Sequence, residues 1–481
     1  MRDDAGSDDF AHSLASFSNR LPTPLGATPA DLNRSLPVCP LKPSPADRRR
    51  TSTAQGLEDQ MQFPFSRSTD PNVDLSSLDA FNEGAPFVTF DRMRREDPMA
   101  WSEMVNGDRG FWSVTRHADL LELNRQADLL SSAKGIRMED QTEEEYEARK
   151  TFQETDAPHH RGFRALVSKA FSKSTVAGFE EQIRKIVTDL LDVALAEGEF
   201  DAVDRIARRL PMQMLAQIMG VPQEDGPWLV EKGDALISNS DPDYTDFVVD
   251  QLDGEAYRML PFRSPAAVEL FDYANGLLDR MDAGEQIGVL NLVREPTSTG
   301  TRMSRDEFRN FFCLLVAAGN DTTRYSISAT IHALANNPHL LQALKDGDFT
   351  GWEAAADEMI RYASPTTHFR RTATRDFILH GKQVRAGDKV LLWFIAGNRD
   401  ETAITAPYTI NLRRERNPFL SFGQGGPHIC LGMWLARLEV AIVMQELAKR
   451  IATIEQTAEH SYLRSNFIHG IKHLPVRIIA R

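Results

Sequence analysis

The sequence predicts a mainly α-helical protein with small β-sheets. The stretch from Arg305 to Asn336 has the longest apolar helix pattern, and its middle, FFCLLVAAGNDTT, is apolar on all sides, as expected of a helix through the centre of a large core. Residues 176–220 add two further helical repeats. Strand patterns are short and bounded by glycine turns, which indicates small sheets.

Length and composition narrow the class of protein. The 481 residues, 41% of them hydrophobic, suffice for two or three ordinary domains or for one large one. Acidic residues outnumber basic ones by 69 to 55, and the net charge of -14 argues against a nucleic-acid partner. Cys39, Cys313 and Cys430 are widely separated and give no disulfide framework, so we expect a cytoplasmic protein.

The N-terminal segment predicts neither a secretory signal nor a transmembrane anchor. MRDDAGSDDF is acidic, and no run of about 18 or more apolar residues occurs in the chain. Residues 1–62 are rich in Pro, Ser, Asp and Arg without an apolar period, so we expect a disordered extension. Residues 63–481 are expected to form a single domain.

The first part of the folded region alternates helix and short strand. The segment DRMRREDPMAW, beginning at Asp91, has a helical pattern, and Gly110 to Thr115, GFWSVT, has the aromatic content of a strand. Residues 134–150 lose apolar content and gather acidic side chains, which indicates an exposed loop and a short helix.

Three helices follow. One is expected to open near Asp156 and Pro158, with His160 and Arg164 four residues apart on one face. Two core helices come next in FEEQIRKIVTDLLDVAL and AVDRIARRLPMQMLAQIMGVP, and the glycine and proline at the end of the second close it.

The central helix opens after Ser304, and Glu307 three residues later completes a capping box. Gly319 removes a side chain where a ligand could approach. Polar groups inside an apolar helix cost free energy unless they are paired, so one run is conspicuous: Asn320, Asp321, Thr322 and Thr323. Alternatively, a threonine here donates a hydrogen bond to the carbonyl four residues earlier and bends the helix. This bend and a role in ligand binding are compatible.

The next helix, WEAAADEMIRYA, places Glu358 and Arg361 at i,i+3 and ends before Pro365. Strand signals follow in FILHGKQV, which turns at Gly381, and in KVLLWFIAGNRD. The final stretch has Gly470 between two strand-like arms.

The segment SFGQGGPHICLGMWLARLE combines a glycine-rich loop with the start of an apolar helix near Leu431. Cys430 is therefore expected at a helix N-terminus, where the macrodipole and unpaired N–H groups stabilise a thiolate. A thiolate held in this way suits the axial position of haem iron. The alternative for a cysteine is a small buried hydrophobe.

This loop resembles the haem-binding loop of the cytochrome P450 family, F-G-x-G-x-H-x-C-x-G. The matching residues are Phe422, Gly423, Gly425, His428, Cys430 and Gly432. Gly426 and Pro427 stand where one residue is usual. That longer form resembles a bacterial subgroup that oxidises steroid side chains and methyl-branched lipids, except that Gln424 replaces a glycine.

The resemblance implies a cytochrome P450 fold with haem b between the central helix and the cysteine loop. AGNDTT matches the family's oxygen-activation motif, which implies catalytic roles for Asp321 and Thr322 and places Ala318 and Gly319 against the cofactor. The residues expected at the haem propionates are His160, Arg164, Arg371 and His428.

Other positions follow from the same resemblance. Glu358 and Arg361 match the family's structural E-x-x-R motif, with Arg414 as a partner. The expected substrate pocket is largely apolar and consists of Leu314, Ala318, Thr366, Phe369 and Phe467.

The resulting hypothesis is a monomeric haem-thiolate monooxygenase that hydroxylates a hydrophobic small molecule, namely a steroid side chain, a terpenoid or a branched fatty acid. Electrons are expected from a ferredoxin and its reductase, and the ferredoxin is expected to dock on a basic patch formed by Arg413, Arg414 and Arg416. The alternatives are a peroxide-driven peroxygenase or isomerase, and a non-catalytic haem- or lipid-binding protein.

Overall fold

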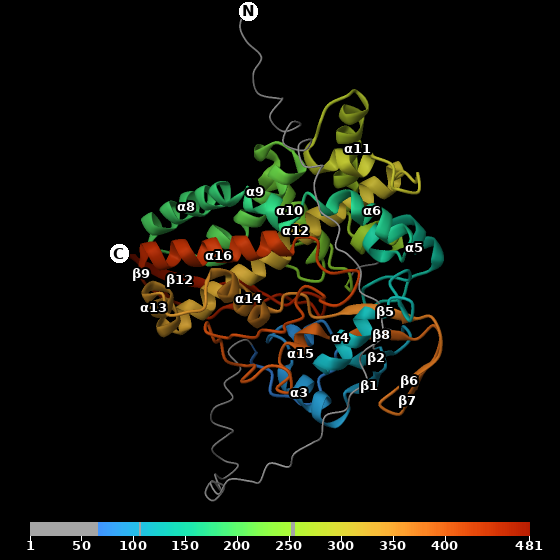
Figure 1. The fold of residues 1–481 in the computed structure, drawn as a ribbon, viewed down its shortest axis with the longest axis horizontal. Coiled ribbons are helices and arrows are strands. Elements are labelled where there is room, and N and C mark those ends of the chain that lie inside the picture. Colours follow the sequence, from blue (N-terminus) through green and yellow to red (C-terminus); the bar gives the residue numbers. More distant parts are fainter. Residues whose placement is uncertain (1–65, 105–106, 252–254) are drawn as a thin grey trace, which may run out of the picture. The chain divides into compact units, whose positions relative to one another are not determined.

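The computed structural model describes residues 66–104, 107–251 and 255–481. The disordered extension expected at residues 1–62 lies outside the described residues. Helices dominate the described part of the chain, and its short strands form one five-stranded sheet and three smaller ones (Figure 1). The predicted class, mainly α with small β-sheets, is confirmed.

The longest helix, α12 (Arg305–Asn336), has the predicted bounds. Ser304 Oγ accepts a hydrogen bond from Glu307 N at 3.2 Å, and Glu307 Oε2 accepts one from Ser304 N at 2.8 Å, so the predicted capping box is present. The helix is central because several others pack against it, among them α9 (Arg209–Met219), α10 (Gly226–Ile237), α11 (Ala266–Asp282), α14 (Trp352–Ala363) and α16 (Met433–Arg450).

The two helices predicted between residues 176 and 220 are present, with one local difference. The first is α8 (Glu180–Glu197). The second begins with a π-helix, η3 (Val203–Ala207), and α9 follows it directly in the chain. Gly220, at φ +76°, ends α9, and a Cβ there would lie 2.5 Å from Gly288 N, so a side chain does not fit.

The larger sheet has the order β1-β2-β8-β5-β3, in which β2 and β8 are parallel and the other neighbours antiparallel. Its strands are β1 (Met99–Ser102), β2 (Phe111–Val114), β3 (Leu130–Ser131), β5 (Phe369–Ala373) and β8 (Lys389–Leu392). A separate apolar cluster packs here, and the nearby helices are α3 (Phe87–Glu96), α4 (His117–Arg125) and α15 (Phe394–Gly397) (Figure 1).

The strand predicted in KVLLWFIAGNRD is shorter than expected. It ends at Leu392, and α15 follows after Trp393. The side chains from Trp393 to Ala396 are all buried, so their apolar pattern does not separate a buried strand from a buried helical turn.

The C-terminal arms pair in two different sheets. β10 (Ser461–Tyr462) and β11 (Ile471–His473) form an antiparallel pair around the predicted turn. The last strand, β12 (Pro475–Ala480), instead pairs with β9 (Ile451–Gln456) and β4 (Glu199–Asp201). A Cβ at Gly470 would lie 2.1 Å from the ring of Tyr325, so this glycine allows the hairpin to pack against α12.

The remaining elements connect these layers. They are β6 (Phe377–Leu379) and β7 (Lys382–Val384), the α-helices α5 (Glu143–Arg149), α6 (His159–Ser168), α7 (Lys173–Ala177) and α13 (Pro338–Asp346), and the 3-10 helices η1 (Asp79–Phe81), η2 (Phe152–Glu154), η4 (Gln223–Asp225), η5 (Glu255–Tyr257), η6 (Pro261–Arg263) and η7 (Gly288–Arg294).

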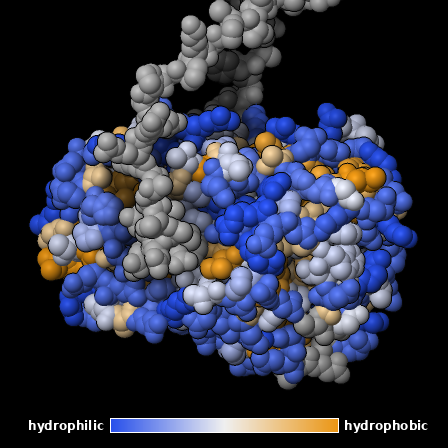
Figure 2. All heavy atoms as spheres, turned by 90° about the horizontal axis from the view of Figure 1, so that it is seen from below, coloured by the Kyte–Doolittle hydropathy of each residue, from blue (hydrophilic) through white to orange (hydrophobic). Residues whose placement is uncertain are grey.

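The surface is mainly polar. Figure 2 shows a face that is mostly hydrophilic, with small separate hydrophobic patches. Within the residues that the structure describes, none of the helices has the length and apolar character needed to cross a bilayer.

Candidate active site

A cavity of about 210 Å³ lies between α12 and the cysteine loop. Residues of α6, of the segment before β5 and of the start of α16 complete its wall. The sequence-predicted residues that line it are His160, Arg164, Leu314, Ala318, Gly319, Thr322, Thr366, Phe369, Phe422, His428, Cys430 and Gly432. The fold therefore brings together most of the positions selected from the sequence.

One face of α12 opens onto this cavity. Leu314, Ala318 and Thr322 follow one another at intervals of four residues and are not fully buried, unlike most of the surrounding helix. Thr322 Oγ1 donates to Ala318 O at 3.3 Å, which is the i-4 bond considered above. Gly319 also lines the cavity, but a Cβ there would lie 2.5 Å from Leu215 Cδ2. Its missing side chain therefore also makes room for Leu215, which lines the same cavity.

The cysteine loop is held by its own backbone and by α4. Gly423 and Gly425 have φ of +68° and +93°, which favour glycine. Cys430 N donates to Phe422 O at 2.8 Å. The side chain of Asn124 donates to Gly423 O at 2.8 Å, a contact from a distant element that the sequence did not suggest. These bonds fix the loop so that the Cys430 side chain faces the cavity.

The electrostatics of Cys430 differ from the expectation. Helix α16 begins at Met433, two residues later than predicted, with Gly432 as its cap. Burial raises the pKa of the Cys430 thiol, although the Gly432 N–H and the charges of Arg164 and Arg437 oppose this shift. The Cys430 residue is exposed towards the cavity, and a metal ion bound to its sulfur would deprotonate the thiol.

Cationic and imidazole groups gather at one edge of the cavity. The rings of His160 and His428 have centroids 3.9 Å apart, and His428 Nε2 lies 3.2 Å from Ser132 Oγ. Arg164 Nη2 donates to Ile429 O at 2.5 Å. These contacts bring α6 and the cysteine loop together around one small space.

Arg371 of β5 belongs to the same group. It is buried, and its Nη1 donates only to Arg370 O, at 2.8 Å, among the described residues. Burial lowers the pKa of Arg371 to about 10. The charge of Arg371 in turn lowers the pKa values of both imidazoles described above.

This cluster has more positive charge than its surroundings balance. Burial, together with neighbouring arginine charges, lowers the pKa of His160 to about 4 and that of His428 to about 2. His428 Nδ1 is buried with no hydrogen-bond partner among the described residues. The nearby Asp156 already accepts bonds from Ser131 Oγ and Ser132 N. The two carboxylates of a haem would supply the missing anions, so the residues present fit that group.

Asp321 lies behind this face of α12, fully buried. Its carboxylate accepts a hydrogen bond from Ser238 Oγ at 2.9 Å and pairs with Arg324 on the next turn. Burial raises the pKa of Asp321 to about 7, since the charge of Asp234 adds to this effect and only Arg324 and the hydrogen bonds oppose it. The carboxyl can therefore exchange protons near neutral pH.

A polar chain leads from Asp321 towards the surface. Arg324 Nη1 lies 2.8 Å from Asp234 Oδ1 of α10, and Arg208 Nε donates to Asp234 Oδ2 at 2.8 Å. The Arg208 side chain is 32% exposed, so the chain reaches solvent. Asn320 Nδ2 also donates to Asp234 Oδ1, at 2.7 Å, which accounts for a second polar residue in the apolar helix.

Asp234 and Arg324 were missed in the sequence. Arg324 carried a usable signal, because it is a cation three residues after Asp321 in an apolar helix. Asp234 gave none, since its partners come from helices distant in sequence.

A cluster of ion pairs next to the cysteine loop consists of Glu358, Arg361 and Arg414. Arg361 donates from Nε to Glu358 Oε2 at 2.9 Å and from Nη2 to Oε1 at 2.8 Å. Arg414 Nε donates to Glu358 Oε2 at 3.0 Å. Arg361 Nη1 also donates to Asn398 O at 3.1 Å, and Asn398 Oδ1 accepts from Leu420 N at 2.6 Å. The cluster is thus linked to the residue that precedes the loop.

This arrangement changes the basic patch expected for docking. The Arg414 side chain is only 7% exposed because it lies on Glu358. Arg413 is exposed but pairs with Asp348, and Arg416 is exposed. A patch formed by all three arginines is therefore wrong.

The expected substrate residues divide between two adjoining cavities. Leu314, Ala318, Thr366 and Phe369 line the cavity described above, whereas Phe467 lines a second one. Leu314 lines both, and the rings of Phe369 and Phe467 meet edge to face with centroids 5.7 Å apart.

Comparisons with known proteins agree with this site. The cytochrome P450 family profile matches residues 352–458. Methyl-branched lipid omega-hydroxylase of Mycobacterium tuberculosis is 33% identical over 417 residues, covering 84% of this chain and 94% of that protein. Steroid C26-monooxygenase of Mycolicibacterium smegmatis is 30% identical over 420 residues, with 84% and 94% covered. A Mycobacterium marinum cytochrome P450 in complex with pseudoionone superposes with a TM-score of 0.74 at 32% identity, covering 81% of this chain and 94% of that structure.

These relatives match along nearly their whole length. Their family carries a haem bound through a cysteine thiolate, which agrees with a cavity that combines a cysteine with unbalanced cationic groups. The chain therefore belongs to the cytochrome P450 family and is a haem-thiolate monooxygenase.

Proposed function

We propose that this monooxygenase hydroxylates a steroid side chain, a terpenoid or a branched fatty acid, with O2 and with electrons from a ferredoxin and its reductase. The observation that carries the proposal is that Cys430 and Thr322 line the same cavity. Asp321 is buried behind Thr322. A thiolate ligand and a protonation route are the two elements that oxygen activation needs.

In this proposal the Cys430 thiolate would bind the iron of the haem. When bound, the haem activates O2 and transfers one oxygen atom to a C–H bond. His160, Arg164, Arg371 and His428 would hold its propionates, because each side chain can donate hydrogen bonds and the four lie close together at one edge of the cavity. Glu358, Arg361 and Arg414 act through the backbone that supports the loop.

Thr322 and Asp321 would control protons. The Thr322 hydroxyl now bonds to Ala318 O at 3.3 Å, a long bond that it can exchange for one to a molecule in the cavity. Asp321 can hold a proton near neutral pH, and its ion pair with Arg324, which also pairs with Asp234, keeps the carboxyl in place on the residue next to Thr322. Leu314, Ala318 and Phe369 make the wall near Thr322 largely apolar, which limits the water that can reach this part of the cavity.

The substrate class rests on the lining and on the relatives. The lining near Thr322 is mostly apolar, from Leu314, Ala318 and Phe369, which suits a hydrophobic ligand. The named relatives act on methyl-branched lipids and on steroids, and one solved relative binds pseudoionone. Each supports one of the three substrate kinds.

The function is tested by loading the protein with haem and titrating sterols, terpenes and branched fatty acids while the spin state of the iron is followed. Ligands that shift it are then supplied with NADPH, ferredoxin and ferredoxin reductase. We expect a hydroxylated product that contains oxygen from labelled O2. Product formation with peroxide but not with ferredoxin would favour a peroxygenase, and failure to take up haem would contradict both.

A further inference from the structure

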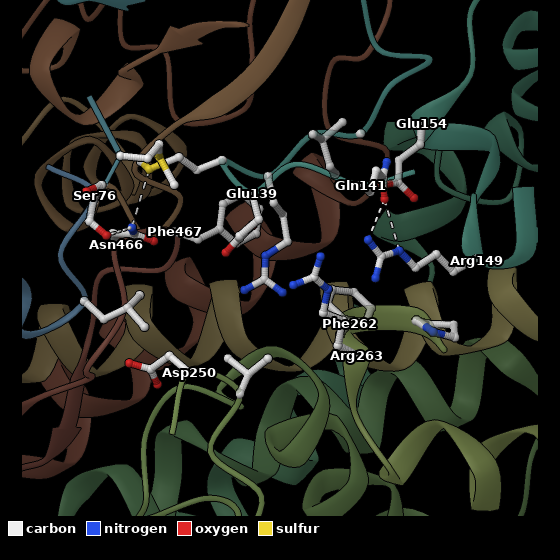
Figure 3. A pocket seen from close by; sticks show the side chains of 18 of the residues that line it. Ser76, Glu139, Gln141, Arg149, Glu154, Asp250, Phe262, Arg263, Asn466 and Phe467 are labelled. Carbon is white, nitrogen blue, oxygen red and sulfur yellow. Dashed lines mark hydrogen bonds between the residues drawn. The ribbon is translucent and has the colours of Figure 1, made fainter. Parts of the chain in front are cut away.

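The second cavity, of about 420 Å³, is balanced in charge (Figure 3). Four arginines and four carboxylates line it, among them Arg149, Arg263, Glu139 and Glu154. This lining therefore favours neither an anion nor a cation. The haem cavity differs at the edge where His428 lies, because one ring nitrogen of His428 is buried without a hydrogen-bond partner among the described residues.

The two ring nitrogens of His428 have different surroundings. Nε2 lies 3.2 Å from Ser132 Oγ, within hydrogen-bond distance, whereas Nδ1 has no such neighbour in the described part of the chain. A neutral imidazole donates from one nitrogen and accepts at the other. Two tautomers therefore exist, and the direction of the hydrogen bond with Ser132 decides between them.

Ser132 is held in place by its backbone. It directly follows β3 and is 1% exposed. Its N–H donates to Asp156 Oδ1 at 3.0 Å, and Ser131 Oγ donates to the other carboxylate oxygen. Asp156 O in turn accepts from His160 N at 2.9 Å, so one residue fixes both Ser132 and the start of α6. The Ser132 hydroxyl takes no part in these bonds, and its hydrogen can point at His428.

Only one arrangement of the hydrogens suits an anion beside His428. If Ser132 Oγ donates to Nε2, the ring hydrogen is on Nδ1, which then acts as a donor. If Ser132 Oγ accepts instead, Nδ1 carries a lone pair that repels a carboxylate. The charges of Arg371 and Arg164 lie near the same edge, and guanidinium groups pair well with carboxylates. The first arrangement is therefore the one that matches its surroundings.

We propose that Ser132 is a positioning residue for the haem: its hydroxyl donates to His428 Nε2 and holds the tautomer whose Nδ1–H binds a propionate. Ser132 does not line the haem cavity, so it acts through His428. Hydrogen bonds of this kind set ring tautomers in cofactor sites. This inference rests on the proposed function and adds to it a residue from outside the cavity wall.

The first test reads the tautomer directly, by ¹⁵N NMR of the histidine-labelled, haem-loaded protein in its diamagnetic ferrous carbon monoxide form. The signals of His428 are identified by their loss in His428→Gln. We expect a hydrogen on Nδ1 and none on Nε2 in the wild type. A hydrogen on Nε2, alone or together with one on Nδ1, would overturn the proposal.

The second test compares Ser132→Thr with Ser132→Val, because the two new side chains are similar in size and differ in the hydroxyl group. Transfer of haem to an excess of a haem-binding acceptor protein measures the dissociation rate. Ser132→Val should lose haem about tenfold faster than Ser132→Thr, as expected when a partner of a cofactor-binding side chain is removed. Its reduction potential should also be lower, because loss of a donor leaves more negative charge beside the iron.

Ser131→Ala is the matched control, because Ser131 Oγ donates to Asp156 and accepts from Ala133 N but does not contact His428. This variant should keep the wild-type tautomer and reduction potential. Equal dissociation rates and equal potentials in Ser132→Thr and Ser132→Val would overturn the role of Ser132 and leave the proposed function intact. If the wild type takes up no haem, or oxidises no lipid with ferredoxin, the proposed function itself fails.

Discussion

Arg414 and Glu358 lie 56 positions apart, yet Arg414 donates to both carboxylate oxygens, at 3.0 Å from Nε and 3.2 Å from Nη2. Both side chains are almost fully buried. Removing one partner of a buried ion pair leaves an uncompensated charge, so Arg414→Ala should lower the free energy of unfolding by about 3 kcal/mol. Urea unfolding of the haem-loaded protein measures this. Arg413→Ala, at an exposed pair with Asp348, should cost no more than about 0.5 kcal/mol. Equal losses in both variants would contradict a supporting role.

Thr322 and Thr330 both donate to the carbonyl four residues earlier on α12, but only Thr322 lines the haem cavity. Thr322→Ala should therefore reduce the amount of product formed per NADPH consumed, because NADPH oxidation continues without the hydroxyl that directs protons. Thr330→Ala should leave this ratio unchanged. The ratio is measured by product chromatography beside NADPH absorbance, and an unaltered ratio in Thr322→Ala would exclude the proposed role.

Asp321 should impose a pH dependence on turnover. Burial raises its pKa to about 7, so the carboxyl holds a proton to donate below that pH and loses it above. The rate of product formation should fall as pH rises through about 7. Asp321→Asn should lower the rate on the order of 10²-fold and remove this inflection. Asp306→Asn, at an exposed position in the first turn of the same helix, should keep both the rate and the inflection.

Glu439 should make stability depend on pH. It is buried in α16, and its Oε1 has no hydrogen-bond partner among the described residues. Burial raises its pKa from 4.5 to about 8. Between these values the folded protein keeps a proton that the unfolded chain loses, so the free energy of unfolding falls as pH rises, by up to ~1.4 kcal/mol per pH unit.

Glu439→Gln tests this contribution, because glutamine cannot ionise. Its free energy of unfolding should stay flatter than that of the wild type between pH 5 and 8, as measured by denaturant titrations of the haem-loaded protein. The exposed control Glu415→Gln should keep the wild-type slope. The same slope in all three proteins would show that Glu439 does not carry the effect.

The sequence predicts the local features of this fold well. Both ends of α12 follow from the Ser304 capping box and from a long apolar pattern, which depend on neighbouring residues only. The end of α9 likewise follows from Gly220, which adopts a positive φ there. Local chemistry decides these boundaries, so no knowledge of distant contacts is needed.

Features that depend on distant partners are harder to predict. The assignment of β12 to a different sheet from β11 depends on β4 and β9, which lie elsewhere in the chain. The link from Asp321 to Asp234 crosses between two helices. The second cavity escaped prediction for the same reason, since the residues that line it lie in separate loops and helices and show no shared motif.

In the proposed function, Cys430 provides the thiolate ligand of the haem. The most direct measurement is the absorption spectrum of the reduced carbon monoxide complex of Cys430→Ser, beside that of Cys313→Ser, which alters a buried cysteine in α12 away from the cavity. We predict that Cys313→Ser keeps the red-shifted Soret band typical of thiolate-bound haem and that Cys430→Ser loses it. A Cys430→Ser variant that retains this band would show that another group binds the iron.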